Sequence, residues 1–170
     1  PIACSMIMKS ESEIDSESAM RRPEYETIYA FGPNCGISDV DTIIRANHLC
    51  EEYGLDTISC GVVISYLMEC EQRGIVVDTF LNPLPQFGDA DSLLATIHRI
   101  ADGKKIDNIL TKGVKRLAEA VGQGTERFAM CVKGLELPGY DPRGMKGMAL
   151  LYATADRGGC HVRGSTLRAE

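Results

Sequence analysis

The sequence predicts a mainly α-helical protein, an irregular multi-helix bundle with at most a few short extended segments. Apolar residues recur at helical spacing in several long runs of the 170-residue chain. Polar capping residues precede these runs and glycines follow them, which is the usual punctuation of helices. Pro- and Gly-rich breaks separate the runs, so the helices should pack against one another with short connections.

The first half of the chain contains two long predicted helices. Residues 9–22 are polar and lack periodicity, which indicates a surface loop. Ser38 can cap a helix that ends at Gly54, because apolar residues follow it at helical spacing. The next helix is predicted over residues 56–73. Its residues are apolar on most faces, so we expect it to be buried among other helices.

The middle of the chain begins with an extended piece over residues 75–81, after which prolines interrupt regular structure. Asp89 or Asp91 then caps a helix whose apolar residues run to Ile100. Another helix is predicted over residues 111–121, and the glycines that follow it end that run.

The last part of the chain is predicted to hold a strand and one further helix. Residues 128–137 read as a short buried strand or extended segment. The pair Asp141-Pro142 predicts the start of a helix, because proline is favoured at the first helical position. We place a boundary between a helical domain over residues 1–130 and the start of a second over residues 131–170.

Composition excludes several classes of partner. A net charge of -6 and the lack of a basic stripe argue against binding to nucleic acid or an anionic membrane. The apolar stretches are far shorter than the roughly 20 residues that cross a bilayer, and no signal peptide is evident, so we expect a cytoplasmic protein. The seven cysteines are odd in number and form no CxxC pair, which argues against a secreted disulfide framework.

Three stretches contain candidate functional residues, each with a structural alternative. Residues 23–27 place two acids around a tyrosine and are either surface carboxylates or part of a site. Residues 53–59 join two helices, and the second helix either is simply capped there or presents its N-terminus to an anionic cofactor. His161 follows a glycine pair among arginines and is either a loop histidine or a proton carrier. We expect His48 and His98 to be structural.

Five segments together resemble the aldehyde ferredoxin oxidoreductase family, and they occur in the family's order over about residues 23–164. They are Glu24-Tyr25-Glu26-Thr27, Asn47 with Tyr53-Gly54-Leu55-Asp56-Thr57-Ile58-Ser59, Lys133-Gly134-Leu135-Glu136-Leu137-Pro138, Asp141-Pro142-Arg143-Gly144, and Ala153-Thr154-Ala155-Asp156-Arg157-Gly158-Gly159-Cys160-His161. The resemblance implies the helical domains of an enzyme that oxidises aldehydes to carboxylic acids. It also implies a tungsten bis-pterin cofactor of the molybdopterin type, and a [4Fe-4S] cluster that passes electrons to ferredoxin.

The resemblance also implies roles for individual residues. Glu26 and His161 would lie nearest the metal and act in catalysis, where a carboxylate and an imidazole suit proton movement. The family's pterin motif, which resembles Asp-x-x-Gly-Leu-Asp, falls on residues 51–56. Its cofactor-binding residues would be Glu51, Gly54, Leu55 and Asp56, with Glu51 standing where the family has Asp. The stretch that carries a Glu-x-x-His metal site in some members reads Arg45-Ala46-Asn47-His48 here, and we predict no metal there.

The N-terminus resembles the end of the family's cluster loop, Cys-x-x-Cys-Pro-x-x-Cys. Cys4 would be one cluster ligand, and the other thiolates and the β-rich N-terminal domain would belong to regions outside these 170 residues. We therefore expect an inactive fragment without tungsten or cluster in isolation, since one thiolate does not hold a cluster that needs four. Its partners would be the remaining domains of the enzyme, ferredoxin, the aldehyde and a second subunit in a homodimer.

Two alternatives stay open beside this reading. One is a tungsten subunit of an aromatic acyl-thioester reductase of the benzoyl-CoA type, in which the same scaffold serves other redox chemistry. The other is a non-catalytic helical module that works through protein contacts. The presence of both Glu26 and His161 speaks against the second alternative.

Overall fold

The computed structural model describes residues 7–8, 20–77, 83–102 and 108–164. Within these ranges the chain is mainly helical, as predicted, and its strands form only two short hairpins. The helices are α1 (Tyr25–Phe31), α2 (Val40–Tyr53), α3 (Thr57–Gln72), α4 (Ala90–Ala101), α5 (Val114–Val121) and α6 (Lys146–Thr154). The 3-10 turns are η1 (Pro33–Cys35), η2 (Ile109–Lys112) and η3 (Thr125–Phe128).

The strands pair in two antiparallel hairpins. β1 (Ile7–Met8) pairs with β2 (Met20–Arg21), and β3 (Cys131–Val132) pairs with β4 (Leu135–Glu136). The predicted surface loop over residues 9–22 therefore ends in a strand, while residues 9–19 lie outside the described part of the chain. Residues 128–137 were expected to form a short buried strand or an extended segment. They begin at the end of a 3-10 turn and continue as an extended hairpin whose residues are mostly half-buried.

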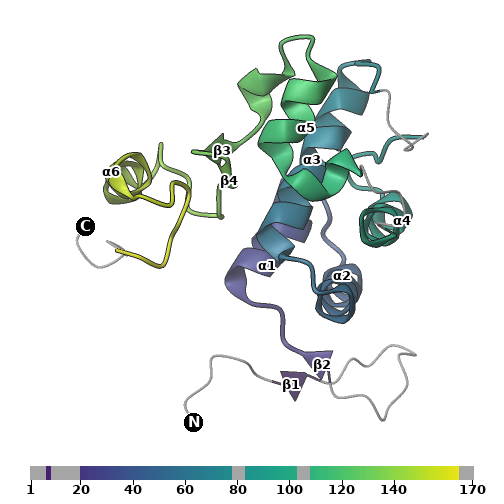
Figure 1. The fold of residues 1–170 in the computed structure, drawn as a ribbon. Coiled ribbons are helices and arrows are strands. Elements are labelled where there is room, and N and C mark those ends of the chain that lie inside the picture. Colours follow the sequence, from purple (N-terminus) through teal and green to yellow (C-terminus); the bar gives the residue numbers. More distant parts are fainter. Residues whose placement is uncertain (1–6, 9–19, 78–82, 103–107, 165–170) are drawn as a thin grey trace.

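Helix α3 forms the centre of the fold. Figure 1 shows α1, α2, α4 and α5 arranged around it, with α6 set to one side beyond the second hairpin. Most of α3 is buried, as its apolar composition predicted, including Ile64, Leu67 and Met68, which are fully buried. Gly61 lets α1 approach closely, because a Cβ there would lie 2.7 Å from the Cβ of Ala30.

Capping residues set most helix ends where the sequence placed them. Asp56 and Asp89 accept N–H groups of the first turns of α3 and α4. Gly54 ends α2 in the left-handed conformation with φ 67°. The cap of α2 is Asp39 and not Ser38, because the Asp39 carboxylate accepts the N–H of Thr42 at 2.9 Å.

Two other predicted elements were wrong in detail, and one helix was not predicted. Helix α1 was not anticipated, since it is short and Glu24 at its N-cap makes no side-chain hydrogen bond to it. The helix predicted over residues 111–121 is divided at Gly113, where φ is 83°. The last helix begins at Lys146, because the Asp141 carboxylate accepts the Arg143 N–H in a tight turn and does not cap a helix.

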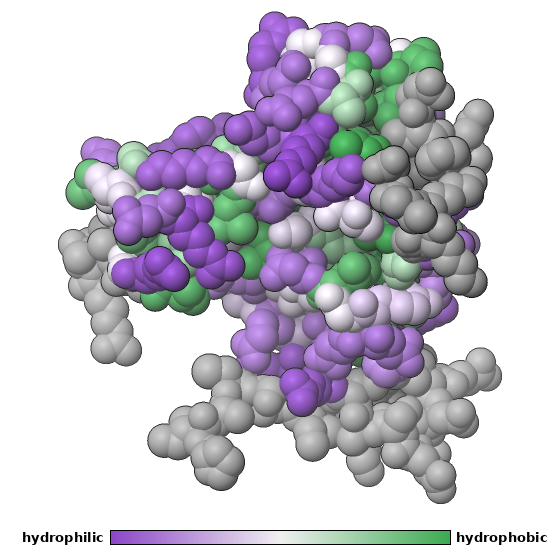
Figure 2. Space-filling view, in the orientation of Figure 1, coloured by the Kyte–Doolittle hydropathy of each residue, from purple (hydrophilic) through white to green (hydrophobic). Residues whose placement is uncertain are grey.

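The surface of the molecule is mixed in character. Figure 2 shows hydrophilic residues over most of the face in view, with apolar patches between them. The apolar core residues run from α1 to α5, while Met148 and Tyr152 of α6 are buried outside that cluster. The boundary predicted near residue 130 stays a prediction.

Candidate functional site

Glu26 lies in the first turn of α1 with 8% of its surface exposed. Its Oε2 accepts the backbone N–H of Gly139 at 2.6 Å. Its Oε1 is buried and has no hydrogen-bond partner within the described parts of the chain. Leaving such an oxygen unpaired costs about 1 to 3 kcal/mol, so Glu26 Oε1 is suited to accept a proton or a polar ligand.

His161 faces that oxygen from the loop after α6. Its Nε2 lies 3.9 Å from Glu26 Oε1, so the structure brings together two side chains from opposite ends of the chain. The separation is longer than a hydrogen bond, and therefore neither group satisfies the other. A small polar group between them would contact both.

Two glycines allow the loop before His161 to reach the β3–β4 hairpin. A Cβ on Gly158, where φ is 88°, would lie 2.1 Å from the carbonyl oxygen of Val132. A Cβ on Gly159 would lie 2.8 Å from the carbonyl oxygen of Leu135. The N–H of Gly159 donates to the Val132 carbonyl at 3.3 Å. Any side chain at these positions would move His161 away from the hairpin.

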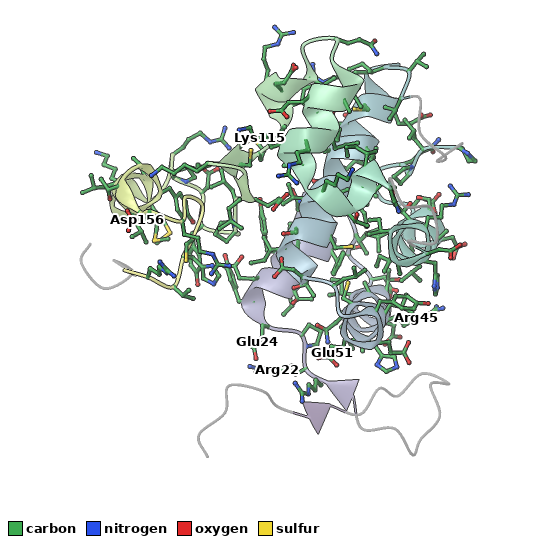
Figure 3. All side chains as sticks on the ribbon, viewed as in Figure 1. Arg22, Glu24, Arg45, Glu51, Lys115 and Asp156 are labelled. Atoms are coloured by element: carbon green, nitrogen blue, oxygen red, sulfur yellow. The ribbon has the colours of Figure 1, made fainter. Side chains whose placement is uncertain are left out.

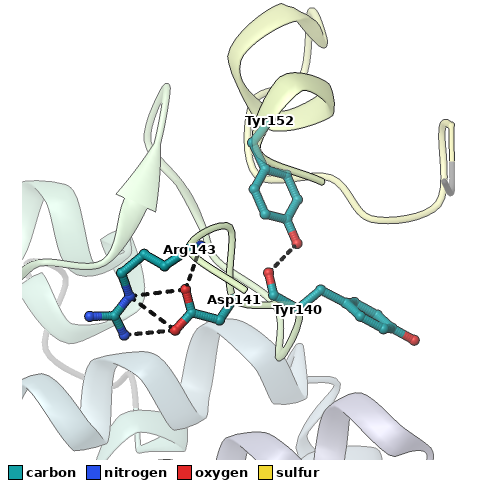
Figure 4. A network of polar contacts seen from close by, with 4 residues as sticks. All are labelled: Tyr140, Asp141, Arg143 and Tyr152. Atoms are coloured by element: carbon teal, nitrogen blue, oxygen red, sulfur yellow. Dashed lines mark hydrogen bonds and ion pairs between the residues drawn. The ribbon is translucent and has the colours of Figure 1, made fainter. Parts of the chain in front are cut away.

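Aromatic rings border the pair formed by Glu26 and His161. The Tyr140 ring lies between those of Tyr25 and His161, with centroids 5.1 and 5.9 Å away. The Tyr152 hydroxyl donates to the Tyr140 carbonyl at 3.1 Å, and the neighbouring turn is closed by the Asp141–Arg143 ion pair (Figure 4). Burial, together with the charge of Glu26, raises the pKa of Tyr140 above its ordinary value. Sequence reasoning missed this tyrosine.

The predicted cofactor-binding residues lie at the junction of α2 and α3. Gly54 and Asp56 are exposed and Leu55 is half-buried. Asp56 Oδ1 accepts the Ser59 N–H at 2.8 Å and so caps the start of the 16-residue helix α3. The structural reading of this junction is confirmed, because Gly54 ends one helix and Asp56 caps the next. The role in cofactor binding stays a prediction.

Glu51, the first residue of the predicted cofactor motif, projects from α2 and is exposed (Figure 3). Glu24 and Arg22 lie at the approach to α1 in the same view. The Oε1 of Glu51 accepts the side-chain amide of Asn47 at 3.4 Å. That contact lies one helical turn back on α2, so the carboxylate stays beside its own helix.

Glu136 is a second buried carboxylate that sequence reasoning did not single out. It belongs to a segment that carries part of the family resemblance, residues 133–138, and it is 5% exposed. Its Oε1 accepts the N–H of Val114 at 2.7 Å, and its Oε2 accepts the hydroxyl of Ser59 at 2.9 Å. The carboxylate therefore ties β4 to the first turns of α5 and α3. No local signal in the sequence marks such a long-range contact.

The cysteines within the described residues form no disulfide bonds. Cys50, Cys60 and Cys70 are buried, where a free cysteine behaves as a small apolar residue, whereas Cys131 is half-buried at the hairpin. Burial raises the pKa of Cys35 to about 12. Cys4, the predicted cluster ligand, lies outside the described residues. In the part of the chain that is described, no His, Cys, Asp or Glu group of three or more is placed to hold a metal.

The other two histidines make surface contacts, in keeping with their predicted structural role. His48 Nε2 lies 3.4 Å from Glu52 Oε1 one turn along α2. His98 Nδ1 lies 2.8 Å from the hydroxyl of Tyr53, which joins the ends of α2 and α4.

The whole chain, residues 1–170, matches the family model described as aldehyde ferredoxin oxidoreductase, domains 2 and 3. The chain belongs to the aldehyde ferredoxin oxidoreductase family. It is 43% identical over 165 residues to the tungsten-containing aldehyde ferredoxin oxidoreductase of Thermococcus kodakarensis and 42% identical to that of Pyrococcus furiosus. Each alignment covers 96% of this chain and 26% of the relative. The chain thus spans about a quarter of the length of these aldehyde ferredoxin oxidoreductases.

Two other proteins are similar to this chain at lower identity. The aliphatic sulfonate oxidoreductase WOR-like subunit of Pyrococcus furiosus is 29% identical over 154 residues, which cover 87% of this chain and 25% of that subunit. The structure resembles the active site complex BamBC of benzoyl coenzyme A reductase with a TM-score of 0.68 and 23% identity. That likeness covers 92% of this chain and 23% of the other, and it supports the fold alone.

The six described α-helices are short or carry polar residues along their length. None of those helices combines the length and the apolar character needed to cross a bilayer.

Proposed function

We propose that this chain is part of a tungsten-pterin oxidoreductase that oxidises aldehydes to carboxylic acids. Its electrons would pass through a [4Fe-4S] cluster to ferredoxin. The identity of 42–43% to tungsten-containing aldehyde ferredoxin oxidoreductases supports the reaction class. The observation that carries the proposal is the unpaired Glu26 Oε1, which lies 3.9 Å from His161 Nε2. A buried carboxylate oxygen and an imidazole at this separation are placed to act on one small polar substrate.

The residues present fit the cofactor in their chemistry. Asp56 presents an exposed carboxylate at the start of α3, where it can accept N–H groups of a pterin ring. The N–H groups at the start of the same helix favour an anionic ligand. When bound, the tungsten-pterin group supplies the acceptor for the two electrons released by the aldehyde.

Conversion of an aldehyde and water to a carboxylic acid releases two protons along with these electrons. Glu26 Oε1 accepts a proton from the attacking water, because it is buried and has no hydrogen-bond partner among the described residues. His161 Nε2 takes the other proton and returns it to solvent, since its side chain is a quarter exposed. The Gly139 N–H holds Oε2 and so directs Oε1 toward the histidine.

The remaining parts of the proposed enzyme lie outside this chain's described residues. Cys4 would supply one thiolate to the cluster, and other regions would supply the rest. Ferredoxin, the other domains of the enzyme and a second subunit of a homodimer are the proposed partners. A cytoplasmic location is proposed with them.

The test uses the full-length parent enzyme. It should contain tungsten, pterin and iron, and it should reduce ferredoxin when an aldehyde is added. Reduction of an aromatic acyl thioester without aldehyde oxidation would favour the benzoyl-CoA type reductase. A protein without tungsten, pterin or turnover would favour the non-catalytic module and would refute the proposal.

A further inference from the structure

Two hydroxyl groups join α1 to the start of α3. The Thr27 Oγ1 lies 2.9 Å from the Thr57 Oγ1, so one hydroxyl donates to the other. Thr27 is 4% exposed and follows Glu26 directly in the chain. Thr57 follows Asp56 directly and is the first residue of α3. This hydrogen bond thus joins the residue next to Glu26, which is proposed to be catalytic, to the residue next to Asp56, which is proposed to bind the cofactor.

The same turn of α3 is held from its other side. Ser59 donates its hydroxyl to Glu136 at 2.9 Å and its N–H to Asp56 at 2.8 Å. Glu136 also accepts the Val114 N–H, so both of its oxygens are paired. A buried carboxylate paired in this way resists displacement, because moving it would leave an unpaired charge.

The contacts close into a circuit around the site. Gly139, shortly after Glu136 in the chain, donates its N–H to Glu26 at 2.6 Å. We name the closed set the positioning ring, and it consists of Glu26, Thr27, Thr57, Ser59, Glu136 and Gly139. Each link is a hydrogen bond or a short piece of backbone.

We propose that the Thr27–Thr57 hydroxyl pair is a positioning device, which sets the distance between the Glu26 carboxylate and the first turn of α3. The proposal rests on the proposed function, since it assigns the cofactor to that turn. Thr27 and Thr57 act through Glu26 and Asp56 and do not themselves touch the substrate. The pair suits this role because it is the contact in the ring that joins the two functional elements directly.

Replacing both threonines by valine changes the distance in a defined way. The oxygens lie 2.9 Å apart, whereas two carbon atoms in contact prefer about 3.5 to 4.0 Å. The substitution should push α1 and α3 apart locally by roughly 0.5 to 1 Å. Because both partners change together to apolar groups of similar shape, no buried hydroxyl is left unpaired and the fold should tolerate the change. A displacement near 1 Å can lower turnover by about 100-fold.

The experiment compares T27V/T57V with wild type in the full-length enzyme. We expect kcat to fall by roughly 10-fold or more, with KM and tungsten and pterin content within about 2-fold. The T27S/T57S variant retains both hydroxyls and should return kcat to within about 2-fold of wild type. Thr96→Val is the matched control, because Thr96 is 2% exposed and its hydroxyl donates to Ser92 within α4, away from the ring.

A crystal structure of T27V/T57V provides a readout that does not depend on turnover. The first turn of α3 should be displaced from α1, and unchanged spacing would overturn the proposal. Wild-type kcat in the folded T27V/T57V variant would overturn it as well, as would an equal loss in T96V. If the double variant does not fold, Thr57→Val alone decides in the same way, because it removes the half-buried hydroxyl of the pair and leaves Thr27 in place. If the wild-type enzyme does not oxidise aldehydes, the proposed function is refuted. The distance between α1 and the first turn of α3 in the crystal structure of T27V/T57V still tests the role of the hydroxyl pair.

Discussion

The backbone N–H of Gly139 donates to Oε2 of Glu26 over 2.6 Å, across 113 positions of the chain. This bond leaves only Oε1 of the carboxylate free to face His161. The orientation of Glu26 therefore depends on a glycine in a loop that carries no catalytic group of its own.

Gly139→Ala should disturb this arrangement. A Cβ at Gly139 would lie 2.6 Å from Cγ of Tyr29, so the loop must shift and the bond to Glu26 must lengthen. Overpacking of this kind costs about 1 to 3 kcal/mol, and it should lower both the melting temperature and turnover. Gly144→Ala is the matched control, since a Cβ there meets only the Asp141 carbonyl at 3.8 Å. Equal behaviour of the two variants in thermal unfolding would contradict the role of Gly139.

Asp56→Ala should reduce cofactor binding as well as stability. Loss of an N-cap costs about 0.5 to 2 kcal/mol, and loss of a hydrogen bond to the cofactor should lower its affinity roughly 10-fold or more. Asp89→Ala removes the equivalent cap from α4 and provides the control. Tungsten and pterin content per chain should fall in the first variant only. A fall of similar size in both would mean that Asp56 acts through helix stability alone.

Stability should decline in alkaline solution because of two shielded tyrosines, the buried Tyr152 and the half-buried Tyr29. Burial raises the pKa of Tyr152 and also that of Tyr29 above the ordinary value of about 10. As the pH rises, the unfolded chain therefore loses these protons before the folded chain does. The contribution of the two neutral tyrosines to stability is fully present below about pH 10 and is lost as the pH rises through their folded pKa. Urea unfolding of wild type and Tyr152→Phe on both sides of pH 10 measures this. Tyr152→Phe should lose less stability than wild type above pH 10. An identical fall of the free energy of unfolding with pH in the two proteins would contradict the role of Tyr152.

Much of the fold could be predicted because helix ends depend on neighbouring residues. Asp56, Gly54 and Asp89 act within a turn of their own position, and the sequence shows them directly. Helix α1 could not be found in this way, since it has no side-chain cap and is held by packing against α3. Helix α6 starts later than predicted because the Asp141 carboxylate accepts the Arg143 N–H in a turn and does not cap a helix there.

The residues of the candidate site were harder to predict from the sequence than the helix ends. Glu26 and His161 received catalytic roles only through a family resemblance, because each alone fits a surface or loop residue as well. Glu136 and Gly139 were not recognised as parts of the site, since their partners lie far away in the chain. Contacts of this range are set by tertiary packing, which no local pattern records.

The most direct test of the account is the turnover of Glu26→Gln in the full-length enzyme at full tungsten content. Gln keeps the size of the side chain but cannot accept the proton, so kcat should fall by on the order of 100-fold or more. His161→Asn should show a similar loss, and the double variant should lose little more than either single variant, because the two groups act on one substrate. Near-normal turnover in Glu26→Gln and His161→Asn enzymes that retain wild-type tungsten would contradict the proposed catalytic roles.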